Sequence, residues 1–460
     1  MTRPHRRPAI AAIVVLAASC ATAQTTTSAP GTETIKRGEY LAVAGDCVAC
    51  HTLPGGRPYA GGLVVPTPMG DIVATNITPS KTAGIGNYTE QQFSDAVRKG
   101  VAADGGHLYP AMPYTSYAKI TDDDIAALYA YFMHGVDSVD VRTTPAHLAF
   151  PFNMRWLMAI WNVMFLDTHP FQPVAGQSAE WNRGAYLTEA LEHCSVCHSP
   201  RNLLFAESTS KRLAGGKVGP WDAPNITSDP NSGIGGWTNA ELVAYLKHGD
   251  AHGKAQAAGS MAEAIDYSLR HLTDADLRAI VTYVKTVPAV HDAADTRPRF
   301  DWGGPSNELA AIRAVAWPAN QAQLTGPQLY DAWCATCHQD NAQGSFDREM
   351  PPLYHNTALG NPESNNLVLV MLDGIHRRGD TVLPMPGFAQ HMTDHQLATL
   401  GAWLVVRYGN PAAKVTDAQI TNLRQGGSPS HLVPVVQAAI GVGAVIAVAM
   451  IALLLRRRMH

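Results

Sequence analysis

Cys47-Val48-Ala49-Cys50-His51 is the first of three five-residue segments that limit what this chain can be. The same pattern returns as Cys194-Ser195-Val196-Cys197-His198 and as Cys334-Ala335-Thr336-Cys337-His338. In a Cys-x-x-Cys-His segment the two thiols can add to the vinyl groups of a porphyrin, and the histidine can ligate the iron. The sequence therefore predicts three covalently bound c-type haems.

Other uses of closely spaced cysteines explain the pattern less well. A thioredoxin-like redox pair, a zinc site and structural disulfides need paired cysteines, but none of them needs a histidine directly after each pair. The three segments use six of the seven cysteines, and the seventh, Cys20, lies in the N-terminal region. The predicted attachment residues and proximal iron ligands are Cys47, Cys50 and His51, then Cys194, Cys197 and His198, then Cys334, Cys337 and His338.

An internal repeat indicates the second iron ligand of the first two haems. The block Asn76-Ile77-Thr78 recurs as Asn225-Ile226-Thr227, an offset of 149 residues, and the match runs without a gap from residue 74 to residue 100 of the first copy. At the same offset Met112 pairs with Met261, whereas the nearby histidines have no counterpart. A methionine thioether is the usual partner of a proximal histidine in electron-transfer cytochromes. We therefore predict Met112 and Met261 as axial ligands.

The third haem needs a separate argument, because its segment lacks the Asn-Ile-Thr block. Met385 follows His338 by 47 residues and stands between Pro384 and Pro386, whose rigid backbone can hold a side chain toward the ring. The sequence favours Met385 as this axial ligand. Met392 and His391 are the alternatives.

The periodicity predicts an all-α fold of three tandem cytochrome c-like domains and a C-terminal transmembrane helix. Thr121, Thr273 and Thr393 each stand as a helix cap before an amphipathic run, at 125–132, 277–284 and 397–406. Helices at 40–49 and 185–195 are expected to lead into the first two haem segments, and no alternating strand pattern of useful length occurs. The expected domains are 30–143, 179–288 and 325–410, and the linkers are 144–178, 289–324 and 411–431.

The two ends of the chain predict its cellular location. Residues 1–23 have a basic start, a short apolar run and a small-residue end, as in a secretory signal peptide, although Cys20 could instead be a lipidation site. Residues 432–455 carry no charge and are long enough to span a bilayer, and the basic tail 456–460 follows. Because basic residues favour the cytoplasmic side, we expect a single-pass protein of the bacterial inner membrane, in contact with lipid, with its haem domains in the periplasm.

Charge and composition exclude other classes. The chain has 460 residues, of which 46% are hydrophobic and 16% charged, so it is too apolar for a disordered protein. It has 34 basic and 38 acidic side chains, and without the six terminal arginines the balance becomes 28 to 38, a net charge of −10. We therefore expect no nucleic-acid partner. The linker at 144–178 is rich in aromatic residues and predicts a packed helix, an interface with another subunit or a segment that dips toward the membrane.

The motifs resemble those of one family. The segments at 109–114 and 259–263, which carry Met112 and Met261, together with the Asn-Ile-Thr blocks and the three haem motifs, are similar to the tri-haem cytochrome c subunit of bacterial membrane-bound dehydrogenases. The resemblance covers nearly all of residues 33–425 and implies electron transfer from a large catalytic subunit to ubiquinone. That subunit would be of the alcohol or aldehyde dehydrogenase type, including gluconate and sorbitol dehydrogenases, and would hold PQQ, a flavin or a molybdenum cofactor; a small subunit is a further potential partner.

No substrate-oxidising site is expected in the chain itself, because no Rossmann glycine fingerprint, P-loop or zinc-protease motif stands out. Two other functions remain open at this point. The chain could be the cytochrome c subunit of a terminal oxidase, or a haem peroxidase in which one iron keeps an open position.

Overall fold

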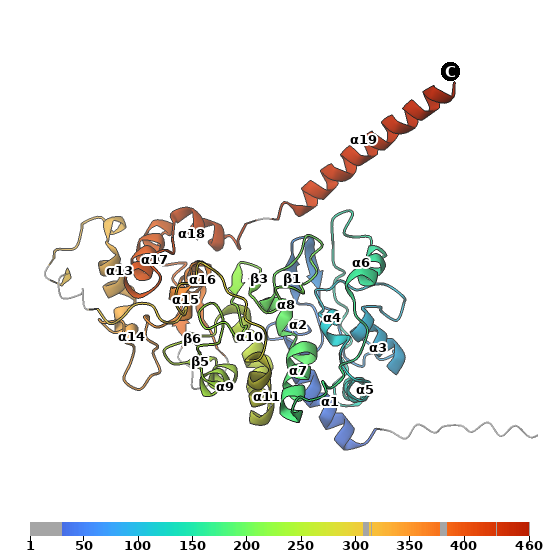
Figure 1. Cartoon of the computed structure of the whole chain (residues 1–460), viewed down its shortest axis with the longest axis horizontal. Helices are drawn as coiled ribbons and strands as arrows, with labels where there is room; N and C mark the ends of the chain where they lie inside the picture. Colours follow the sequence, from blue (N-terminus) through green and yellow to red (C-terminus); the bar gives the residue numbers. More distant parts are fainter. Residues whose placement is uncertain (1–29, 307–311, 314, 378–383, 429, 460) are drawn as a thin grey trace, which may run out of the picture.

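The computed structural model describes residues 30–306, 312–313, 315–377, 384–428 and 430–459. The expected signal peptide and Cys20 lie outside the described residues. The described part is rich in helices and carries short two-stranded ladders, and a long C-terminal helix extends away from the body (Figure 1).

The first sequence repeat begins and ends in helices that pack together. Its elements are α1 (Thr32–Ala44), α2 (Cys47–Cys50), β1 (Val64–Thr67), β2 (Gly70–Val73), α3 (Glu90–Lys99), α4 (Tyr114–Tyr117) and α5 (Asp122–His134). The helix α6 (Leu157–Phe165) follows in the aromatic-rich linker.

The second repeat has the same order with additions. Its elements are α7 (Ala179–Tyr186), the π-helix η1 (Leu187–Leu191), α8 (Cys194–His198), β3 (Gly216–Val218), β4 (Trp221–Ala223), α9 (Asn239–His248), β5 (Asp250–Ala251), β6 (Ala255–Gln256), α10 (Gly259–Tyr267), η2 (Leu269–His271) and α11 (Asp274–Val284).

The third haem segment belongs to a further group of helices. Its elements are η3 (Gln321–Gln323), α13 (Gly326–Trp333), α14 (Ala335–His338), α15 (Thr357–Gly360), α16 (Asn365–Asp373), β7 (Gly374–Ile375), β8 (Met385–Pro386), α17 (Asp394–Tyr408) and α18 (Asp417–Arg424). The chain ends in α19 (Leu432–Arg458), which continues the expected membrane helix through the basic residues.

The three capped helices form as the sequence predicts. The side chains of Thr121, Thr273 and Thr393 accept hydrogen bonds from the backbone of the first turns of α5, α11 and α17. In each repeat the first helix packs on the last, α1 on α5 and α7 on α11. A Cβ atom on Gly38 would lie 2.0 Å from the carbonyl oxygen of Ala127, and one on Gly184 would lie 1.8 Å from that of Ala279. Glycine at these crossings therefore permits the close helix contact.

The structure corrects two expected helices and adds short strands. The helices expected at 40–49 and 185–195 do not run into the haem segments, because Asp46 (φ 50°) and His193 (φ 38°) adopt the left-handed conformation directly before the first cysteine. The antiparallel ladders, such as β1 with β2 and β3 with β4, were not predicted. Each strand has only two to four residues, which is too short to show an alternating pattern.

The buried apolar residues form two large cores. One contains residues of both sequence repeats, from Leu41 to Val284. The other runs from Leu324 to Leu423 and surrounds the third haem segment. The first two repeats thus fold around a shared apolar interior.

Polar contacts join the second repeat to the third haem segment's helices. Asn366 exchanges two hydrogen bonds with the backbone of Asp222, at 2.9 and 2.8 Å. Arg377 pairs with Asp266 of α10 at 2.7 Å, and both side chains are only 4% exposed. This contact attaches the segment before β8 to the helix that carries Met261.

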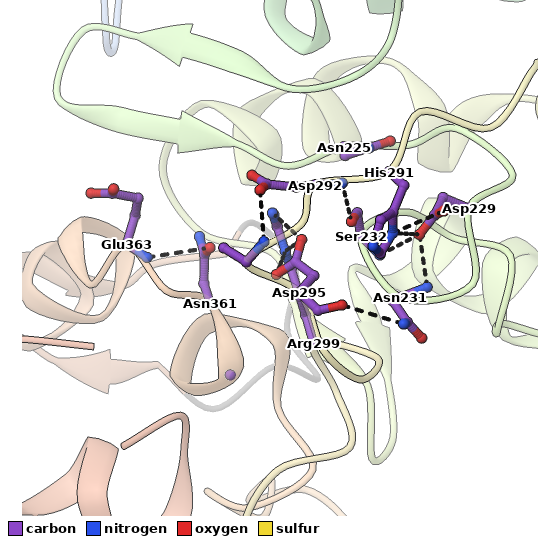
Figure 2. A network of polar contacts seen from close by, with 12 residues as sticks. Asn225, Asp229, Asn231, Ser232, His291, Asp292, Asp295, Arg299, Asn361 and Glu363 are labelled. Carbon is purple, nitrogen blue, oxygen red and sulfur yellow. Dashed lines mark hydrogen bonds and ion pairs between the residues drawn. The ribbon is translucent and has the colours of Figure 1, made fainter. Parts of the chain in front are cut away.

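The linker after α11 is fastened to the second repeat (Figure 2). His291 lies 3.3 Å from the carboxylate of Asp229, and the backbone N–H of Asp292 donates to Ser232. Arg299 pairs with Asp295 at 2.8 Å within the linker itself. The first part of the expected linker at 289–324 therefore contacts the second repeat, and its described residues 321–323 form the short helix η3.

Candidate haem-binding sites

Each proximal histidine makes the same hydrogen bond. The Nδ1 atom of His51 lies 2.6 Å from the carbonyl oxygen of Thr75, that of His198 lies 2.7 Å from Pro224, and that of His338 lies 2.9 Å from Pro351. A carbonyl oxygen can only accept, so Nδ1 must carry the proton and Nε2 must offer its lone pair. This is the orientation in which a histidine ligates a metal through Nε2.

The surroundings also keep these imidazoles neutral. Burial lowers the pKa of His51, His198 and His338, although the backbone hydrogen bond acts in the opposite direction. A neutral imidazole is the form that binds iron. The three histidines therefore fit the role that the sequence assigns to them.

The repeated Asn-Ile-Thr blocks follow the first two carbonyl groups directly. The Asn76 side-chain amide donates to the carbonyl of Val139 at 2.7 Å and accepts from the backbone N–H of Thr78 at 2.9 Å. Asn225 repeats this pattern with Val290 at 2.7 Å and Thr227 at 2.8 Å. Both asparagines are buried and so fix the backbone that faces the histidine.

The carbonyl partners were not predicted. The residues that supply them, Thr75 and Pro224, are themselves 149 positions apart and directly precede Asn76 and Asn225. These positions lie within the sequence repeat, but the sequence does not show that their carbonyl groups accept hydrogen bonds, because any residue has a backbone carbonyl. For the third site, Pro351 has no counterpart in the repeat.

The motif cysteines and the wider residue set fit haem attachment. All six are free thiols in the structure. Among the described residues, no group of three or more His, Cys, Asp and Glu side chains is placed to hold a metal ion. A c-type haem needs two thiols for covalent attachment and one imidazole with one further axial ligand from the chain, so the free thiols and the histidine of each segment are compatible with haem attachment.

Met112 and Met261 both lie partly buried against the core shared by the two repeats. A tight turn holds Met112, since its N–H donates to the carbonyl of Tyr109 and its own carbonyl accepts from Tyr114 at 2.7 Å. Met261 lies in the first turn of α10. Their assignment as axial ligands remains a prediction from the repeat.

The candidates for the third axial ligand lie in one region. Met385 is partly buried on β8, opposite Ile375. Met392 is 4% exposed within the second core. The ring of His391 stacks on Trp333, which directly precedes Cys334, at a centroid distance of 5.9 Å. Met385 therefore stays a prediction with Met392 and His391 as its alternatives.

The first two haem segments lie next to each other. The hydroxyl of Tyr117 donates to the carbonyl of Gly45 at 2.6 Å, two residues before Cys47. The ring of Tyr117 also meets that of His193, directly before Cys194, at 5.6 Å. In addition α10 contacts α2, so Met261's helix touches the first haem segment. One tyrosine thus bridges the two segments, a role that its sequence position did not reveal.

The chain is similar to a family model and to several known proteins. The family model for cytochrome c matches residues 35–135 and 324–406. The chain is 42% identical to the fructose dehydrogenase cytochrome subunit of Gluconobacter japonicus, over 96% of this chain and 95% of that protein. It is 38% identical to the gluconate 2-dehydrogenase cytochrome c subunit of Pantoea cypripedii, over 85% and 89% of the two chains. It is 36% identical to the cytochrome c subunit of the quinone alcohol dehydrogenase of Gluconobacter oxydans, over 86% and 83%.

Proposed function

Because this chain belongs to the cytochrome c subunits of membrane-bound dehydrogenases, we propose that it relays electrons from a catalytic subunit to ubiquinone through three c-type haems. The observation that carries the proposal is the threefold histidine arrangement. In each site a backbone carbonyl holds Nδ1, so that Nε2 of His51, His198 and His338 is free for iron.

A haem iron bound in this way supplies reversible one-electron transfer. The chain's own residues would hold the ring and cover the iron. The two cysteines of each segment would fix the porphyrin covalently, and Met112, Met261 and Met385 would occupy the sixth positions. If these three methionines bind the irons, no iron keeps an open position for ligand chemistry, and this would disfavour the peroxidase alternative.

The contacts between sites support a continuous relay. Tyr117 joins the first and second haem segments through Gly45 and His193. The buried pair of Arg377 and Asp266 joins the helix of Met261 to the third group of helices. Each proposed haem therefore has a neighbouring site in direct protein contact.

The catalytic partner would oxidise a hydroxyl-bearing substrate. Three of the relatives are named for fructose, gluconate and alcohol, all of which carry hydroxyl groups, and another is named for nicotinate. We propose a sugar, a sugar acid or an alcohol as the substrate class of a separate large subunit with a PQQ, flavin or molybdenum cofactor, to which a small subunit can be added. These names favour a dehydrogenase complex over a terminal oxidase.

The C-terminal helix is the proposed membrane anchor. Among the described residues, α19 is the one helix that is long and apolar enough to cross a bilayer, and no part of its apolar stretch is buried against the rest of the protein. Arg456, Arg457 and Arg458 end it. We propose that this basic end faces the cytoplasm and that the haem-binding body lies in the periplasm.

Purified native complex tests the proposal. Intact mass should show three haems on this chain, and substrate should reduce them under anaerobic conditions. Addition of a soluble ubiquinone analogue should then reoxidise them within catalytic turnover in a stopped-flow instrument. Fewer than three attached haems, or haems that substrate reduces but quinone does not reoxidise, would overturn the relay.

A further inference from the structure

The outward face of α6 is apolar. Trp156, directly before the helix, is 59% exposed, and Ile160, Val163 and Met164 are 51%, 89% and 53% exposed. These positions are spaced by four, three and one residues, so they lie on one side of a helix. A helix on a protein surface in water normally presents its polar side there.

The inward face carries the polar group instead. The Asn162 side chain accepts from the hydroxyl of Tyr114 at 2.8 Å and donates to the carbonyl of Lys99 at 3.1 Å. Trp161 is buried, and its indole N–H donates to the carbonyl of Leu204 at 2.9 Å. The polarity of α6 is therefore inverted relative to a water-facing helix, and its inner face packs between the two repeats.

Neighbouring loops extend the apolar surface. The hydrogen bond from Trp161 places the loop of Leu203 and Leu204 against α6, and these side chains are 97% and 54% exposed. Phe150, before α6, is 50% exposed. We call this surface the α6 patch, and its residues are Phe150, Trp156, Ile160, Val163, Met164, Leu203 and Leu204.

A hydrogen bond relates the α6 patch to the anchor. The side-chain amide of Gln437, in α19, donates to the carbonyl of Phe150 at 2.9 Å. Figure 1 shows α19 leaving the body from the side on which α6 lies. At ~1.5 Å per residue, the uncharged run 432–455 is ~36 Å long, against ~30 Å for the hydrocarbon layer. Gln437 then lies roughly 5 Å below the outer edge of that layer, so Phe150 is at the depth of the membrane surface.

The charge of this segment also suits a lipid surface. Residues 141–166 contain no aspartate or glutamate, although the chain outside its two ends has a net charge of −10. Arg155 lies beside the exposed Trp156, and tryptophan with nearby basic residues is typical of segments at a membrane interface. The absence of acidic side chains would favour neither exposure to water nor the binding of a basic partner protein.

We propose that the α6 patch is embedded in the periplasmic surface of the lipid bilayer, beside α19, as a second membrane contact. The proposal rests on α19 crossing the membrane, as proposed above. A single helix joined to the body by the short segment after α18 leaves the body free to rotate. A second contact fixes which side of the haem-binding body faces the lipid.

Site-directed spin labelling of the full complex in phosphatidylethanolamine and phosphatidylglycerol nanodiscs tests this. In the haem-loaded protein the six motif cysteines would be thioethers, so a label would attach at an introduced cysteine. The three sites are Val163→Cys in the α6 patch, Asp123→Cys at an exposed position of α5, and Val445→Cys in α19. Collision with oxygen reports lipid, and collision with a water-soluble nickel chelate reports water.

We expect the oxygen-to-nickel accessibility ratio at Val163→Cys to exceed that at Asp123→Cys several-fold, and to lie below that at Val445→Cys. A label at Val163 that is accessible to nickel would show that the α6 patch faces water, and would overturn the proposal. A label that is immobile and shielded from both reagents would also overturn it, because a protein subunit would then cover the α6 patch. A low ratio at Val445→Cys would refute the anchor instead. Ile160→Cys gives the second reading of the α6 patch, and haem absorbance verifies that each variant is folded.

Discussion

The hydroxyl of Tyr40 donates a 2.6 Å hydrogen bond to the carboxylate of Asp276, 236 residues further along the chain. Tyr186 is the counterpart of Tyr40, because the segment Arg37-Gly38-Glu39-Tyr40-Leu41 recurs as Arg183-Gly184-Ala185-Tyr186-Leu187, and it donates a 2.5 Å bond to Asp124 in the first repeat. A tyrosine of each repeat therefore donates a hydrogen bond to an aspartate of the other repeat. This is the pattern of an interface between two copies related by an approximate twofold axis.

Removal of either phenol should weaken this interface. Tyr40→Phe and Tyr186→Phe each delete a hydrogen bond to a carboxylate, a loss of about 1.5–3 kcal/mol in the free energy of unfolding. Tyr129→Phe is the matched control, because its hydroxyl donates to the carbonyl of Tyr88 within one repeat. Its loss should be smaller, about 1 kcal/mol. Denaturant unfolding followed by circular dichroism measures all three, and equal losses would contradict a special role of the exchanged pair.

Asp276 should also make stability depend on pH. Burial alone would raise its pKa, but hydrogen bonds from Arg183 and Tyr40 hold the pKa below the ordinary value. The unfolded chain then binds the proton more tightly, so the stabilisation is complete above the ordinary aspartate pKa of about 4 and is lost as pH falls through the folded-state pKa. Asp276→Asn removes this contribution.

The measurement is the urea midpoint of both proteins between neutral and acidic pH. The wild-type advantage over Asp276→Asn should shrink as the solution is acidified. Asp123→Asn, at an exposed position in the first turn of α5, controls for the loss of a helix N-terminal charge. A constant difference across the range would mean that the pKa of Asp276 is the same in the folded and unfolded chains, and would contradict the lowered pKa.

Local signals in the sequence were sufficient to predict the helix caps that the structure shows. Thr121, Thr273 and Thr393 predict their helices because a cap depends on only a few neighbouring residues. The repeat also paired Met112 with Met261, since duplication keeps the spacing of a loop. These features depend on short separations along the chain.

Other features depend on the folded chain. The left-handed turns at Asp46 and His193 break helices that periodicity would continue, and non-glycine residues give little sign of such a turn. The bridging role of Tyr117 requires two segments that are far apart in sequence to meet. The sequence of α6 shows only a group of aromatic residues, because its inverted polarity depends on Asn162 facing inward in the folded chain.

The buried pair of Arg377 and Asp266 should hold the third group of helices on the second repeat. Both side chains are 4% exposed, so Arg377→Ala leaves the carboxylate of Asp266 buried without this partner. The free energy of unfolding should fall by about 3 kcal/mol. Arg270, at 3.3 Å from the same carboxylate, compensates part of the charge. Arg270→Ala is the control, because that side chain is 30% exposed and its pair should contribute about 1 kcal/mol or less.

Two measurements on both variants test this pair: the free energy of unfolding and the rate of electron transfer from substrate to quinone. Arg377→Ala should keep three haems but slow the transfer, whereas Arg270→Ala should change neither strongly. If the two variants behave alike, Arg377 does not maintain the contact between the second and third sites.

Replacing Met385 and Met392 in separate variants decides which of them is the third axial ligand. Met385→Ala should open one iron of the three, so that the reduced protein binds carbon monoxide at a single haem. Met385→His should close that iron again and lower one reduction potential, because a second imidazole stabilises the ferric state more than a thioether does. Met392→Leu is the control, since this volume-conserving change in the second core should cost less than about 1.5 kcal/mol and leave the spectrum unchanged. Carbon monoxide binding by Met392→Leu but not by Met385→Ala would transfer the assignment to Met392, and the stacked Trp333 and His391 would then mark the distal side of the third haem.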